Sequence, residues 1–92
     1  MNKDSNMKIE KMVELLFKSI PYSQHIEDLE FSTGDKVIEI IFNWRGARYS
    51  LRFVNGSFSC SELQNEMLVG TDASILIAHA MNRSHTISEI NS

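Results

Sequence analysis

An arginine-rich segment, residues 44–53, holds the side chains best suited to binding anions. Three of the four arginines lie there, beside two aromatic residues that can stack or fill an interface: Arg45, Arg48, Arg52, Trp44 and Tyr49. A guanidinium donates several hydrogen bonds in one plane, which suits phosphates and carboxylates. Because the chain carries a formal net charge of −3, this local cluster predicts a partner-binding surface. Cross-strand pairing with acids such as Glu39 is the structural alternative.

Residue types that serve catalysis or metal binding are scattered along the chain. Cys60 is the single cysteine, and no close ligand spacing links it to the histidines His25, His79 and His85. We expect Cys60 to be a small half-buried side chain on a strand rather than a nucleophile. Acids between Glu27 and Glu39 favour a solvated sheet face over an acid–base pair. We therefore predict no catalytic residue, metal, cofactor, small-molecule substrate or enzymatic activity.

Length and composition indicate one small soluble domain spanning residues 1–92. The chain is 42% apolar and 23% charged, which is typical of globular proteins. Its longest apolar run, Ile75 to Ala78, is too short to cross a membrane, and its first eleven residues do not resemble a secretory signal. A single cysteine fits a reducing compartment. We expect a cytoplasmic protein without a membrane partner.

The first element that must position the arginine-rich segment is an amphipathic helix. Its apolar residues recur at helical spacing: Ile9, Met12, Val13, Leu16 and Ile20. Leu15 and Phe17 widen this stripe, so the helix is expected to pack on a sheet. Asn6 is the predicted cap, and Pro21 ends the helix.

After Pro21 the apolar period changes to two, which predicts an antiparallel meander of three or four strands. A short strand through Leu29 and Phe31 precedes the turn residues 32–35, and the next strand runs to Trp44. Turns at residues 45–47 and at Asn55-Gly56 separate the later strands, of which the last is Ser57–Cys60. One face supplies the expected sheet core: Ile38, Ile40, Phe42, Tyr49, Leu51 and Phe53. Arg48 and Arg52 share the other face.

The C-terminal third is expected to be helical. Residues 61–64 have the spacing of a capping box, which predicts a short helix through Leu68 that Gly70 breaks. Thr71 or Asp72 then caps a helix from Ala73 to about Arg83, apolar on almost every side and therefore buried. The termini, about 1–5 and 85–92, are expected to fray. The predicted fold class is α+β, with an N-terminal helix, the meander and a C-terminal helix (αβββα-like), both helices on one face of the sheet.

This order of elements resembles the double-stranded RNA-binding domain, which has the same layout. That family opens its last helix with a lysine-rich segment that binds phosphates. The corresponding start here is Thr71-Asp72-Ala73-Ser74, and no lysine or arginine follows before Arg83. We therefore do not expect binding of double-stranded RNA.

The chain as a whole resembles phage-encoded anti-CRISPR proteins, in particular the inhibitors of type I-F systems. The resemblance covers the size, the acidic balance and the mixed helix–sheet layout of residues 1–92. It implies a non-enzymatic inhibitor that binds a host Cas–crRNA surveillance complex in the bacterial cytoplasm and blocks hybridisation of target DNA. The implied partners are Cas proteins and crRNA phosphates. These inhibitors share no motif, so the expected contact residues remain those of the arginine-rich segment.

Two other functions fit the same sequence. One is a regulatory or assembly module that homodimerises through a sheet edge or through the apolar last helix. The other is a weak nucleic-acid-binding domain that uses the arginine-rich segment. Salt separates these two functions, because nucleic-acid binding weakens steeply with salt whereas association through apolar area does not.

Overall fold

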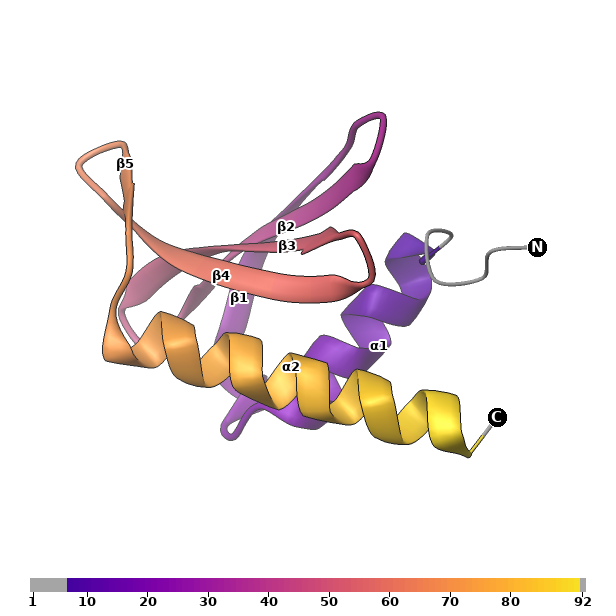
Figure 1. Ribbon diagram of the computed structural model, residues 1–92. Coiled ribbons are helices and arrows are strands. Elements are labelled where there is room, and N and C mark those ends of the chain that lie inside the picture. The colour runs from indigo at the N-terminus through magenta and orange to yellow at the C-terminus, as the bar shows by residue number, and fades with distance from the viewer. Residues whose placement is uncertain (1–6, 92) are drawn as a thin grey trace.

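Two helices pack against one side of a five-stranded antiparallel sheet in the computed structural model, which describes residues 7–91 (Figure 1). The elements follow in the order α1 (Ile9–Ser19), a short 3-10 turn η2 (Ser23–His25), β1 (Ile26–Thr33), β2 (Val37–Trp44), β3 (Ala47–Val54), β4 (Ser57–Gln64), β5 (Met67–Val69) and α2 (Asp72–Ile90). The predicted α+β fold, with a helix at each end of an antiparallel meander, is confirmed.

Helix α1 buries the predicted apolar stripe. Met12 and Leu16 are fully buried, and Ile20 and Leu15 are nearly so. Phe17, expected to widen the stripe, is instead 40% exposed, because it lies on the flank of the helix turned away from the core. Lys8 is the N-cap and makes no side-chain capping bond, whereas the predicted cap Asn6 lies outside the described residues.

The sheet is a meander in which each strand pairs with its neighbour along the chain. Tight two-residue turns join β2 to β3 and β3 to β4, and both have left-handed backbone angles at Arg45, Gly46, Asn55 and Gly56. Such turns match the right-handed twist of the strands they connect. The predicted core residues of β2 and β3 face the helices, and all of them except the partly buried Ile38 are buried. In β1 a bulge between Glu27 and Glu30 shifts the register against β2.

The predicted helix from Ser61 to Leu68 is wrong. Strand β4 continues through this stretch to Gln64 and pairs with β3 along its length, so that the backbone groups of Ser61 and Leu63 are satisfied in a ladder. Asn65 and Glu66 both adopt left-handed angles and turn the chain into β5. The strand following the second hairpin is therefore longer than the predicted Ser57–Cys60, and the sheet gains a fifth strand.

Helix α2 begins at the predicted cap and ends later than predicted. Thr71 and Ser74 form a reciprocal capping box, with Ser74 N donating to Thr71 Oγ1 at 3.1 Å and Thr71 N to Ser74 Oγ at 2.9 Å. The helix continues past Arg83 to Ile90, through the tail expected to fray, and Ser84 accepts a hydrogen bond from Ser19 of α1 at 2.7 Å. No helix among residues 7–91 is long and apolar enough to cross a membrane.

The surface of α2 is less buried than its composition suggested. Ser74, Ile77 and Met81 form its buried stripe, but Ile75 and Leu76 are each more than half exposed. The expectation of a helix buried on almost every side is therefore wrong. A single helix on one face of a sheet contacts that sheet along one stripe, which leaves its outer residues in solvent whatever their type.

Candidate binding surface

Strand alternation divides the arginine-rich segment between the two faces of the sheet. Tyr49 faces the helices and is buried, whereas Arg48 and Arg52 lie on the side of the sheet opposite the helices, here called the open face. Glu39 lies directly across from Arg52 in the register of β2 and β3. This register confirms the prediction that Arg48 and Arg52 share a face.

Arg48 is held by three neighbouring groups on the open face. Its Nη1 donates to Asn43 Oδ1 at 2.8 Å and to the main-chain oxygen of Asp28 at 3.3 Å. Its Nη2 lies 3.2 Å from Glu30 Oε2. Asn43 is oriented in turn by the Asp28 carboxylate, to which its Nδ2 donates at 3.0 Å. The β1 bulge, which places Asp28 in a left-handed conformation, therefore fixes the position of this guanidinium.

Arg52 is held by hydroxyl groups rather than by a carboxylate. Its Nη1 donates to Ser50 Oγ at 3.1 Å and its Nη2 to Ser61 Oγ at 3.2 Å. Ser50, which is buried although it lies on the open face, donates its own proton to Glu39. Among residues 7–91 no carboxylate lies within 4.0 Å of Arg52. The structural alternative, pairing of Arg52 with Glu39 across the strands, is thus met only indirectly, through Ser50.

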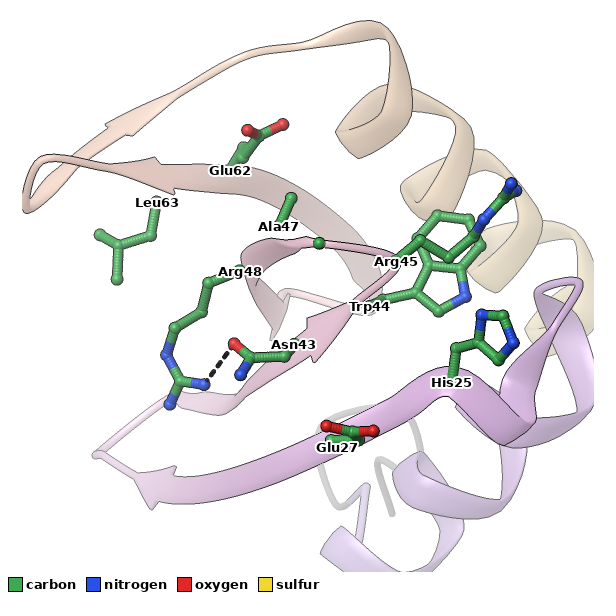
Figure 2. Close-up of a pocket in the computed structure, with 10 residues that line it drawn as sticks. His25, Glu27, Asn43, Trp44, Arg45, Ala47, Arg48, Glu62 and Leu63 are labelled. Carbon is green, nitrogen blue, oxygen red and sulfur yellow. Dashed lines mark hydrogen bonds between the residues drawn. The ribbon is translucent and has the colours of Figure 1, made fainter.

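Arg45 lies apart from the other two arginines. Its left-handed backbone at the β2–β3 turn directs the side chain toward the helix side, where Cζ sits 4.6 Å from the centre of the Tyr22 ring and 5.8 Å from that of Trp44. Figure 2 shows the side chains of Arg45 and Arg48 pointing away from each other. The three guanidiniums of the arginine-rich segment therefore do not converge on one point.

The two aromatic residues of the segment belong to the core. Trp44 is 6% exposed, and its Nε1 donates to the main-chain oxygens of Pro21 and Tyr22 at 3.1 and 3.2 Å. Tyr49 packs beside it, with ring centres 6.0 Å apart. Burial, together with the nearby Glu62 carboxylate, raises the pKa of Tyr49. These rings fix the hairpin on the helices and offer little area to a partner.

A hollow of about 760 Å³ surrounds the β2–β3 turn (Figure 2). Its rim carries charged side chains from β1, the turn, β3 and β4: Glu27, Arg45, Arg48 and Glu62. A Cβ added at Gly46 would meet no atom within 4 Å, so the middle of the turn is open to solvent. The sequence did not point to Glu62, because that residue was assigned to a predicted helix. It did not point to Tyr22 either, because the contact between Tyr22 and Arg45 joins two elements that are distant in the sequence.

Cys60 and the histidines are the remaining candidates for reactive or metal-binding chemistry. Burial raises the pKa of Cys60 to about 12, which disfavours the nucleophilic thiolate. His85 lies edge-on to Phe53 and Phe58, with ring centres 5.3 and 5.9 Å away. Within residues 7–91 no group of three His, Cys, Asp or Glu side chains is placed to hold a metal ion.

Comparisons with known proteins leave the site to be interpreted from its own geometry. No protein-family model matches the chain, and neither the curated proteins nor the solved structures contain a significant match.

Proposed function

We propose that this protein is a non-enzymatic inhibitor that binds a Cas–crRNA surveillance complex in the bacterial cytoplasm and thereby blocks hybridisation of target DNA. The open face of the sheet is its contact surface. One observation carries this proposal: Arg48 and Arg52 lie on the same strand and the same sheet face, with Ser50 between them. Among the described residues no helix covers this face, and no carboxylate lies within 4.0 Å of Arg52.

The arrangement of the two guanidiniums favours binding. The hydrogen bonds that the two guanidiniums donate to Asn43, Ser50 and Ser61 already restrict both side chains, so that less conformational entropy is lost when a partner docks. A guanidinium of this kind pairs well with phosphate and carboxylate groups. On β4 the neighbouring open-face residues are serines, whose small side chains leave Arg52 accessible from the sheet surface.

The resemblance to type I-F anti-CRISPR proteins supplies the partner of this proposal. A surveillance complex presents both acidic side chains and crRNA phosphates, and either group suits Arg48 and Arg52. An inhibitor that only occupies a surface needs no catalytic residue. The proposal is therefore compatible with a thiol at Cys60 whose pKa lies near 12.

The test uses the double substitution Arg48→Ala/Arg52→Ala and a purified type I-F Cas–crRNA complex. Loss of even one charge-assisted bond, typically about 1.5–3 kcal/mol, should weaken binding at least about tenfold. Target-DNA binding by the complex should recover in parallel. Binding is measured by biolayer interferometry and DNA binding by gel shift.

Arg83→Ala is the matched control, because Arg83 is an exposed arginine on α2 and its loss changes the net charge in the same direction. It should bind the complex like the wild type. Thermal melts should show the double variant folded, with a loss of no more than about 2 kcal/mol for partly exposed pairs. Unchanged affinity, or collapse of the fold, would assign both arginines to a structural role.

A further inference from the structure

The charges around the β2–β3 turn alternate in sign. Figure 2 shows Glu62, Arg45, Glu27 and Arg48 arranged around the hollow in that order. The two central elements, the turn and β3, supply the arginines, and the flanking strands β1 and β4 supply the glutamates. Two guanidiniums and two carboxylates cancel in formal charge.

The register places one charge of each sign on each face of the sheet. Glu27 pairs with Asn43 and therefore lies on the open face, where Arg48 also lies. Glu62 pairs with Tyr49 and so lies on the helix side, where Arg45 rests on Tyr22. The pKa of Tyr49 responds to both of these helix-side charges, being raised by burial and Glu62 and lowered by Arg45.

Three of the four charges have no ion-pair partner within residues 7–91. Among the described residues no lysine, arginine or histidine nitrogen lies within 4.0 Å of the Glu27 or Glu62 carboxylates, and no carboxylate lies that close to Arg45. Glu62 accepts one hydrogen bond, from Gln64 Nε2 at 2.8 Å. Unpaired charges of both signs are thus available around one hollow.

This charge pattern suits a protein rather than a nucleic acid. A phosphate backbone brings negative charge alone, so it would gain from Arg45 and Arg48 but be repelled by Glu27 and Glu62. A polypeptide loop that carries one basic and one acidic side chain can pair with both kinds of group. Complementary charge of this type sets the register and specificity of protein interfaces.

We propose that the hollow at the β2–β3 turn binds a loop of a partner protein that presents a basic and an acidic side chain together. This inference rests on the proposed function and names the component of the complex that the site takes, a Cas subunit rather than the crRNA. The basic side chain pairs with Glu27 or Glu62, and the acidic one with Arg45.

Whether removal of the two glutamate charges weakens or strengthens binding tests this assignment. Glu27→Gln/Glu62→Gln keeps the shape of both side chains and the contact to Gln64 but removes two negative charges. For a protein loop, loss of a charge-assisted bond should weaken binding to the type I-F Cas–crRNA complex at least about tenfold. If the hollow instead binds a nucleic acid, removal of the two repelling carboxylates should strengthen binding. A short single-stranded RNA oligonucleotide serves as the nucleic-acid probe, and its affinity is measured for the wild type and for the double variant.

Glu10→Gln/Glu14→Gln on α1 is the matched control for the same change in net charge, and it should bind the complex like the wild type. Weaker binding of the Glu27/Glu62 variant to the complex, without weaker binding to the RNA probe, supports the protein loop. Unchanged or stronger binding to the complex overturns it and leaves the proposed function intact. A wild-type protein that does not bind the complex overturns both proposals.

Discussion

At the scale of single residues, Asn82 connects α2 to the free edge of β4. Its Oδ1 accepts from Phe58 N at 2.7 Å and its Nδ2 donates to Phe58 O at 3.0 Å, which satisfies two backbone groups that β5 is too short to reach. Edge strands with unpaired backbone groups are liable to pair with other chains. The side-chain amide therefore both docks the helix and covers part of the sheet edge.

Asn82→Ala should lower the free energy of unfolding by about 2 kcal/mol or more, because a buried group without its partner costs about 1–3 kcal/mol. Urea denaturation followed by circular dichroism measures this loss. Asn91→Ala, at the exposed end of the same helix, is the control and should change stability by no more than about 0.5 kcal/mol. Equal stabilities for the two variants would show that the Asn82 contacts contribute nothing.

Cys60 should be unreactive in the folded protein. Burial raises its pKa from 9.0 to about 12, so the thiolate is scarce at pH 8. Iodoacetamide should react at least about a hundredfold more slowly with the native chain than with the urea-unfolded chain. Because the folded-state pKa is the higher one, the contribution of this group to stability is complete below about pH 9 and declines as the pH rises toward 12. Equal rates in both states would contradict this environment.

How much of the candidate site the sequence can predict depends on how local each residue's placement is. Strand alternation alone places Arg48 and Arg52 on one face, and the register confirms it. The position of Arg45 depends on Tyr22, a residue of another element with its own left-handed backbone, and no periodicity encodes that contact. Glu62 could have been assigned to a strand by the alternation of serines that begins at Ser57.

At the scale of elements, two adjacent residues of α1, one buried and one exposed, allow the orientation of the helix to be tested. Leu16 is fully buried, so Leu16→Ala should cost about 2–5 kcal/mol. Its neighbour Phe17 is 40% exposed, and Phe17→Ala should therefore cost clearly less, although it removes the larger side chain. Chemical denaturation of both variants gives the comparison. A greater loss from Phe17→Ala would show that the helix is rotated from the described orientation.

The elements that the sequence predicts well have strong periodic patterns. Helix α1 and strands β2 and β3 each bury one face. Their apolar residues therefore recur at helical spacing in α1 and at every second position in the strands. The helix predicted from Ser61 was wrong because a serine and a glutamine three residues apart also occur in strands. The turn at Asn65 and Glu66 contains no glycine that would have marked the end of a strand. The far end of α2 depends on packing against α1 at Ser19, which local sequence does not reveal.

At the scale of the whole molecule, the two faces of the sheet differ in the side chains that they carry. The helix side holds nearly all of the buried apolar residues, from both helices and the inward faces of β2, β3 and β4. The open face holds Arg48, Arg52 and their polar network. Substitutions on the open face are therefore expected to leave intact the core that stabilises the fold.

The meander order of the sheet has a consequence for how the chain folds. Each strand finds its partner next along the chain, and two-residue turns close three of the four pairings, so sheet formation requires little loop entropy. Isolated hairpins are marginally stable in water, however, until their apolar face is covered. That cover comes from the two ends of the chain, where Ser19 and Ser84 meet across 65 residues of sequence. Docking of the helices is thus the long-range step that makes an otherwise local folding process cooperative.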